Sequence, residues 1–94
     1  KRNLDIDIID IRDECLFREG SIPGAINLPY IRIVSGEIQN LDQRKKYVLY
    51  CQNNIKSPFV RSVLESKGFK NVYVLDQGYQ ELRGVAPGGN LHGG

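Results

Sequence analysis

Three segments of the chain are strongly apolar and rich in β-branched or aromatic residues. They are LDIDIIDI at residues 4–11, KYVLYC at 46–51 and NVYVL at 71–75. Short apolar runs of this composition are typical of buried strands. We therefore predict strands near residues 5–11, 46–50 and 72–75.

The segment SPFVRSVLESKGF at residues 57–69 carries helix signals at both ends. Ser57 can cap a helix, Pro58 suits its first turn, and Gly68 suits its end. We expect one apolar face of this helix to cover a sheet, with Phe59, Val60, Val63 and Leu64 on that face.

A shorter helix is predicted within RDECLFREG, at residues 12–20. Asp13 suits its N-cap and Gly20 its end, with Leu16 and Phe17 turned inward. The turn sequence SIPG follows and predicts a brief strand around residues 25–28.

Strands that alternate with helices favour an α/β fold with right-handed parallel crossovers and a parallel sheet flanked by helices on both faces. Ligands of such sheets bind at the carboxyl ends of the strands. Cys51 follows the predicted strand 46–50 directly, so it lies at that edge.

Length and composition indicate one domain, because 94 residues that are 40% apolar suffice for a single core. We expect the domain to span residues 1–84. The glycine-rich segment 85–94 is expected to be a flexible tail.

Charge and hydropathy exclude several function classes. The 13 basic and 11 acidic residues are spread along the chain, so no basic face for nucleic acid is predicted. No apolar run approaches the roughly 20 residues that span a membrane, and no signal-type segment adjoins the N-terminus. We expect a cytoplasmic protein. Two cysteines and a lone histidine, His92, form neither a disulfide scaffold nor a zinc cluster.

The junction between the strand and the helix gives Cys51 two interpretations. Unpaired backbone N–H groups and the helix dipole at such a junction stabilise an anion, and so favour a reactive thiolate. A buried structural cysteine at the end of a strand explains the position equally well.

Several motifs in one order resemble the rhodanese-like family over about residues 7–83. Asp10 and Arg12 match its Asp-x-Arg motif, and GSIPGA at residues 20–25 matches its Gly-His-Ile-Pro-Gly-Ala turn, with Ser21 in place of histidine. The cysteine loop follows, then GFKNVY at residues 68–73 and a turn at Gln77, Gly78 and Tyr79.

This resemblance implies a sulfurtransferase in which Cys51 cycles through a persulfide. The implied partners are a small sulfur donor such as thiosulfate and a thiol or cyanide acceptor, with no cofactor and no metal. The implied anion-binding loop consists of Gln52, Asn53, Asn54, Ile55, Lys56 and Ser57. Asp10 and Arg12 are expected to give structural support by tying the first strand to a neighbouring loop.

The loop departs from the active pattern Cys-x-x-Gly-x-Arg at two positions. Asn54 stands at the glycine, and asparagine tolerates a left-handed backbone. Lys56 stands at the arginine, where it keeps the charge but loses the planar fork. A catalytically silent interaction or regulatory module therefore stays an alternative. A phosphatase is disfavoured because the position of its arginine is occupied by Ser57.

Two further expectations concern the front of the chain. Only six residues precede Asp7, where the family usually has another strand. This indicates either a piece of a longer protein with a fused partner domain or a domain that lacks the usual first strand. Cys15, after the first predicted strand, is a candidate resolving thiol for Cys51, although packing beside Phe17 is the simpler role.

Overall fold

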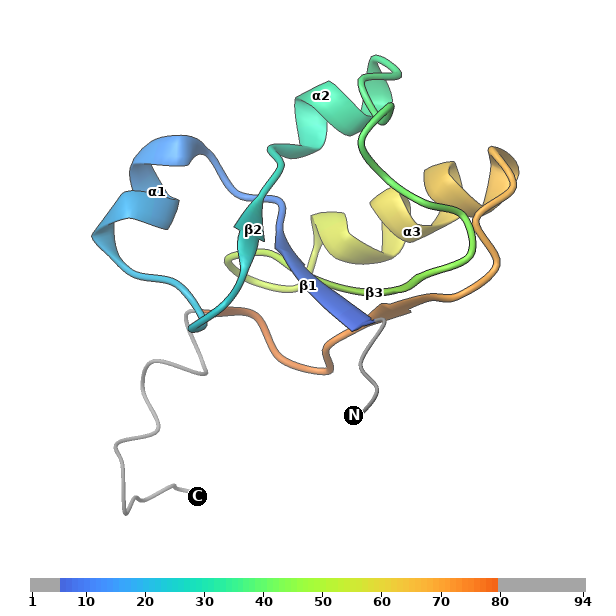
Figure 1. The fold of residues 1–94 in the computed structure, drawn as a ribbon. Helices are drawn as coiled ribbons and strands as arrows, with labels where there is room; N and C mark the ends of the chain where they lie inside the picture. Colours follow the sequence, from blue (N-terminus) through green and yellow to red (C-terminus); the bar gives the residue numbers. More distant parts are fainter. Residues whose placement is uncertain (1–5, 80–94) are drawn as a thin grey trace.

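The computed structural model describes residues 6–79, whose backbone forms a four-stranded parallel sheet with helices beside it (Figure 1). The elements in chain order are β1 (Ile6–Asp10), α1 (Glu14–Glu19), β2 (Ile26–Asn27), α2 (Tyr30–Val34), β3 (Lys46–Tyr50), α3 (Lys56–Ser66) and β4 (Val72–Val74). The three predicted strands and the brief strand β2 are confirmed. The predicted tail at residues 85–94 and the expected lack of a strand before Asp7 concern positions outside the described residues.

The strand order explains where the helices lie. The order is β2-β1-β3-β4, and every neighbouring pair is parallel. From β1 the chain runs through α1 to β2, at one edge of the sheet. It then runs through α2 to β3 and through α3 to β4, which lie on the other side of β1. Because such crossovers are right-handed, α1 lies on the opposite face of the sheet from α2 and α3. The predicted α/β fold with helices on both faces is confirmed, and Figure 1 shows α1 well apart from α3.

The same order creates a crevice between β1 and β3. These strands are neighbours, with Ile9 beside Leu49 and Asp10 beside Tyr50, but the chain leaves their carboxyl ends in opposite directions. Open α/β sheets bind ligands at such a switch point. The segment after Asp10 and the loop after Tyr50 therefore flank the expected binding crevice.

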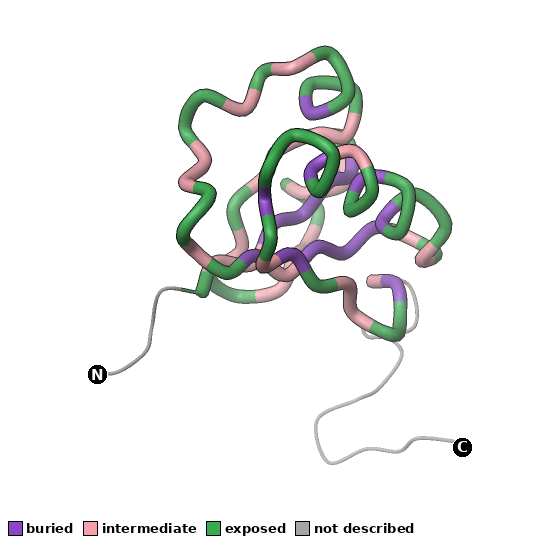
Figure 2. The backbone as a smooth tube through the Cα atoms, turned by 90° about the vertical axis from the view of Figure 1, so that its right-hand side faces the viewer, coloured by how far each residue is buried: buried purple, intermediate pink, exposed green. Residues whose placement is uncertain are grey.

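The core lies between the sheet and the pair α2 and α3. Ile9, Leu49, Val60 and Leu64 are fully buried there, and Figure 2 shows the buried positions gathered in the middle of the molecule. Burial at this scale contributes about 1.5–3 kcal/mol for each large aliphatic side chain. The core thus holds β3, and with it Cys51, in a fixed position.

Two details of the α3 prediction are wrong. Ser57 is not the N-cap, because α3 begins at Lys56 after Ile55, and the Ser57 side chain is fully buried. Phe59 is 56% exposed. At 100° per residue it lies roughly 130° from the centre of the face formed by Ser57, Val60 and Leu64, so it points away from the sheet.

In the shorter helix α1 the predicted ends are confirmed. Asp13 is the N-cap, although its carboxylate makes no capping hydrogen bond, and Gly20 is the C-cap. Leu16 and Phe17 are half-buried. α1 therefore covers its side of the sheet only in part.

The sequence pattern did not reveal α2. Its five residues, YIRIV, are mostly β-branched or aromatic and favour a strand in isolation. Tertiary packing decides the outcome, because Ile33 is fully buried and α2 packs against α3.

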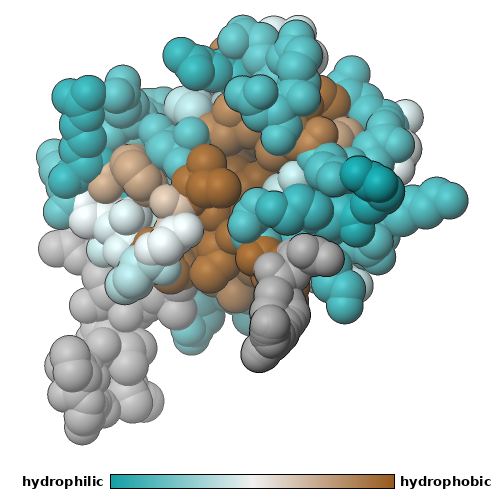
Figure 3. Space-filling view, viewed as in Figure 1, coloured by the Kyte–Doolittle hydropathy of each residue, from teal (hydrophilic) through white to brown (hydrophobic). Residues whose placement is uncertain are grey.

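The described surface mixes polar residues with scattered apolar ones. Ile6, Ile26 and Ile31 are among the exposed apolar side chains, and Figure 3 shows an apolar area in the middle of one face with polar residues around it. None of the helices within residues 6–79 is long and apolar enough to cross a membrane.

Candidate active site

Cys51 follows β3 at the carboxyl edge of the sheet, as predicted. It is 4% exposed and belongs to the core cluster. Its carbonyl accepts a 2.7 Å hydrogen bond from the backbone N–H of Tyr79. The cysteine is thus fixed on one side by the sheet and on the other by the turn after β4.

The loop after Cys51 closes around a left-handed residue. Asn54 has φ 61°, the conformation that glycine supplies in the family pattern. Its side-chain amide donates a 3.0 Å hydrogen bond to the carbonyl of Asp76, which ties the loop to the segment after β4. The asparagine therefore preserves the loop in the way that the sequence predicted.

A close backbone approach at Gly78 seats this loop. A Cβ atom at Gly78 would lie 2.5 Å from the carbonyl oxygen of Gln52 and 2.7 Å from the Cα of Asn53. Both contacts are with backbone, which cannot rotate away. Only glycine at position 78 lets the turn support the cysteine loop at this distance.

The loop lowers the pKa of the Cys51 thiol. Burial is the largest effect and would raise the pKa, since it disfavours the charged thiolate. Hydrogen bonds from the Ser57 hydroxyl and from the backbone N–H groups of Ser57, Lys56 and Asn53 outweigh it. The donors of the loop and of the start of α3 therefore stabilise the thiolate relative to the thiol.

Ser57 has a hydroxyl suited to this anion. The side chain is fully buried, and its Oγ has no nitrogen or oxygen partner. A buried hydroxyl without a partner costs about 1–3 kcal/mol. The Cys51 sulfur is the acceptor within its reach, so the position serves the thiolate rather than the helix end.

A cavity of about 270 Å³ opens beside Cys51, at the switch point between β1 and β3. Its lining is Ile11, Arg12, Asp13, Leu16, Tyr30, Cys51, Gln52, Asn53, Ile55 and Lys56. The predicted loop residues Gln52, Asn53, Ile55 and Lys56 thus share one cavity with Cys51. The space accommodates a small donor with room to spare.

At the rim of this cavity, Lys56 contacts Tyr30. The ammonium nitrogen of Lys56 lies 4.3 Å from the centroid of the Tyr30 ring, which is a cation–π distance. The lysine side chain is therefore held against the cavity wall.

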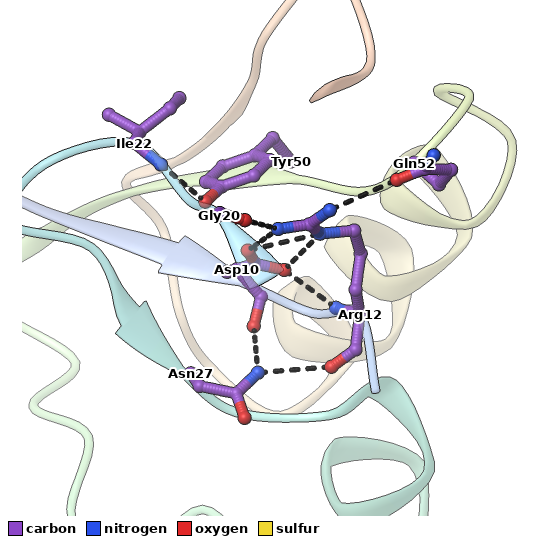
Figure 4. Close-up of polar contacts among 7 residues, drawn as sticks. All are labelled: Asp10, Arg12, Gly20, Ile22, Asn27, Tyr50 and Gln52. Atoms are coloured by element: carbon purple, nitrogen blue, oxygen red, sulfur yellow. Dashed lines mark hydrogen bonds and ion pairs between the residues drawn. The ribbon is translucent and has the colours of Figure 1, made fainter. Parts of the chain in front are cut away.

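Arg12 lines the cavity from within a buried polar cluster (Figure 4). Its guanidinium bonds both carboxylate oxygens of Asp10, with a shortest contact of 2.7 Å. It also donates to the carbonyl of Gly20 at 2.6 Å and to Oε1 of Gln52 at 3.0 Å. The structure places Asp10 and Arg12 where they join β1 to two loops, one of which carries Cys51.

Two tyrosines complete this cluster. Tyr79 lies under the Arg12 guanidinium, with 4.2 Å between Cζ and the ring centroid. The Tyr50 hydroxyl accepts a 3.0 Å bond from the N–H of Ile22. Burial and a hydrogen bond to Asp10 raise the pKa of Tyr50 to about 12, so this phenol stays protonated and is a structural group.

Sequence reasoning placed Cys51 and its loop but missed how other residues join the site. The contact between Gln52 and Arg12 spans 40 positions. No local motif carries such a contact. Cys15 is exposed on α1 and does not line the cavity beside Cys51, so its role as a resolving thiol stays a prediction.

Comparison with known proteins identifies the family. The family model of the rhodanese-like domain matches residues 1–84. A thiosulfate sulfurtransferase GlpE from Pseudomonas entomophila is 31% identical over 86 residues, which cover 92% of this chain and 78% of that protein. A tRNA sulfurtransferase from Thermoplasma acidophilum is 29% identical over 92% of this chain but only 17% of its own length.

Solved structures agree on the fold. A Rhodanese_3-like domain from Anabaena sp. has a TM-score of 0.76 at 24% identity, covering 84% of this chain and 91% of that one. The human single-domain sulfurtransferase TSTD1 has a TM-score of 0.76 at 19% identity, covering 88% and 85%. With the family match over most of its length, the chain belongs to the rhodanese-like family of sulfurtransferase-related domains.

Proposed function

We propose that Cys51 carries sulfane sulfur as a persulfide, taking it from a donor such as thiosulfate and passing it to a thiol or cyanide acceptor. The observation that carries this proposal is the thiol itself. Cys51 lines a cavity, and hydrogen bonds from the start of α3 lower its pKa. A thiolate beside an open cavity is the state that attacks sulfur.

The first step transfers one sulfur to the enzyme. The Cys51 thiolate attacks the outer sulfur of thiosulfate, a new S–S bond forms, and the old S–S bond breaks with its electron pair leaving on sulfite. In the second step an acceptor thiolate or cyanide attacks the terminal sulfur. The Cys51 thiolate is regenerated and the acceptor leaves as a persulfide or thiocyanate. Two transfers through one covalent intermediate predict ping-pong kinetics.

The loop supports both anionic states of the cysteine. Backbone N–H groups of Asn53, Lys56 and Ser57 bond the thiolate sulfur, and the same donors can bond the terminal sulfur of a persulfide. They do not depend on side-chain identity. The carrier step therefore tolerates the departures at Asn54 and Lys56.

Donor binding is the weaker step. Thiosulfate is a dianion that must be held by its oxygens, and Lys56 offers one ammonium where the family pattern has an arginine fork. We expect persulfide formation at a high thiosulfate KM. A donor that needs no bidentate grip is favoured over thiosulfate.

The cellular location of the domain and a fused partner domain are part of the same proposal. We place the domain in the cytoplasm, where reducing conditions keep a thiol such as Cys51 free. Relatives such as the tRNA sulfurtransferase are much longer than this chain. A fused partner domain for this chain is a proposal only. Neither point affects the chemistry at Cys51.

Mass measurement on the intact protein tests the proposal. After incubation with thiosulfate and removal of the excess, we expect one added sulfur atom on the parental chain and on Cys15→Ser, and none on Cys51→Ser. Subsequent addition of cyanide should remove the sulfur and release thiocyanate. A parental chain that gains no sulfur from thiosulfate or from an organic persulfide would instead be a silent interaction module.

A further inference from the structure

Tyr30 stands at the cavity rim opposite the start of α3 and has no part in the sulfur transfer described above. We propose that Tyr30 is a positioning residue, whose ring holds the Lys56 ammonium at the cavity and so sets the affinity for an anionic donor. This inference rests on the proposed function, because it assigns the donor-binding cation of that site.

The tyrosine ring is the fixed partner in this contact. The backbone N–H of Tyr30 donates a 2.9 Å bond to the carbonyl of Ile11, directly after β1. The half-buried side chain packs against the core cluster, and α2 packs against α3. The ring therefore keeps its place whether or not a ligand is bound.

Lys56 is the mobile partner. It is exposed, and its ammonium ends a flexible four-carbon chain that loses rotamer freedom when it is held in one place. An arginine would use two donors to orient itself on an oxyanion, but a lysine has only a point charge. A contact of 4.3 Å with the Tyr30 ring restricts this chain before the donor arrives. The ring covers one side of the ammonium and leaves N–H groups on the other side for donor oxygens.

The other charged groups of the cavity leave this task to Lys56. Among the described residues that line it, the second cation is Arg12, whose guanidinium is occupied by Asp10, Gly20 and Gln52. Asp13 also lines the cavity, and a carboxylate opposes an anion. A dianionic donor thus depends on Lys56, and Lys56 depends on Tyr30 for its position.

A double-mutant cycle on an unreactive chain tests the proposal. Thiosulfate binding is measured by calorimetry on Cys51→Ser, into which Tyr30→Leu, Tyr30→Phe and Lys56→Gln are introduced. We expect Tyr30→Leu to weaken binding about two- to thirty-fold. Tyr30→Phe keeps the ring face and should bind about as tightly as the Tyr30 chain. In the Lys56→Gln background, Tyr30→Leu should have no further effect.

Three outcomes overturn the inference. Tyr30→Leu could weaken thiosulfate binding by the same factor with Lys56 and with Gln at position 56, or Tyr30→Phe could weaken binding as much as Tyr30→Leu does. The third outcome is that the Cys51→Ser chain binds no thiosulfate. Tyr30→Met, which fills similar volume without a ring, replaces the leucine variant if that variant does not fold. Persulfide formation on the parental chain is scored separately by mass. If Tyr30 and Lys56 are coupled in thiosulfate binding but the parental chain forms no persulfide, the proposed function alone is refuted. If the persulfide forms but the two residues are not coupled, this inference alone is refuted.

Discussion

Two cations flank the loop of Cys51, and they differ in almost every physical respect. Arg12 is 6% exposed, and each of its guanidinium nitrogens bonds a protein oxygen. Lys56 is exposed, and its contact is with the face of a ring. A buried cation whose every nitrogen already bonds a protein oxygen supports the fold and offers little to a ligand, whereas an exposed ammonium on a ring keeps its donors free. The comparison teaches that proximity to a reactive group does not by itself make a charge functional.

The largest change in the free energy of unfolding should come from breaking the buried ion pair between Asp10 and Arg12. Arg12→Ala leaves the Asp10 carboxylate buried without its cation and is expected to cost about 3–5 kcal/mol in the free energy of unfolding. Urea denaturation followed by circular dichroism measures this loss. The chain holds a matched control, since Asp42 and Arg44 have the same spacing and similar bonds but lie exposed. Arg44→Ala should change the free energy by at most about 1 kcal/mol, and similar losses from both variants would remove the distinction.

Removing the phenol of Tyr50 should have the next largest effect. Tyr50→Phe leaves the Ile22 N–H without its 3.0 Å acceptor and removes a hydrogen bond to Asp10, with an expected cost of about 1–3 kcal/mol. Tyr73→Phe, at an exposed position, is the control and should be neutral.

The pH dependence of the parental chain gives a second measurement for Tyr50. Its pKa is raised to about 12, above the ordinary value of about 10. The contribution of the protonated Tyr50 phenol to the free energy of unfolding is therefore complete below about pH 10 and is lost as the pH rises toward 12. Tyr50→Phe should lose this part of the alkaline dependence, and an unchanged profile would contradict the role assigned to the phenol.

The contrast between the cations also shows what sequence can predict. Strands β1, β3 and β4 follow from short apolar runs, and the placement of Cys51 follows from parallel topology. Asn54 in a left-handed conformation follows from its position at a glycine of the family loop. These features depend on neighbouring residues or on a recognised motif.

The features that escaped prediction depend on three-dimensional packing. Helix α2 forms because Ile33 is buried, against the strand preference of its residues. Ser57 carries a typical capping signal but lies two residues after the N-cap, Ile55, and turns its hydroxyl to Cys51. The contact of Lys56 with Tyr30 joins two helices across a cavity. No periodicity in the chain encodes such a contact.

Ser57 offers a test that separates stability from function. Ser57→Ala removes a donor to the Cys51 thiolate and should raise the pKa of that thiol. The rate of alkylation by iodoacetamide, followed in a Cys15→Ser background, should then rise at higher pH than in the parental chain. Because the Ser57 hydroxyl bonds no protein nitrogen or oxygen, Ser57→Ala leaves none of these groups without its partner. The free energy of unfolding at neutral pH should therefore change by less than about 1 kcal/mol. A large loss of stability with an unchanged alkylation profile would show that Ser57 is structural.

The smallest change in stability is expected at Lys56. Lys56→Gln removes an exposed charge, so the free energy of unfolding should shift by no more than about 0.5 kcal/mol. Thiosulfate binding to the Cys51→Ser chain should nevertheless weaken, because the ammonium is the donor-binding cation that we infer. Lys67→Gln, at another exposed lysine, should affect neither quantity. Arg12→Ala and Lys56→Gln thus make opposite predictions, one large in stability and the other confined to binding. If Lys56→Gln destabilises the chain as much as Arg12→Ala, or leaves thiosulfate binding intact, then the exposed cation is not the functional one and the comparison fails at its central point.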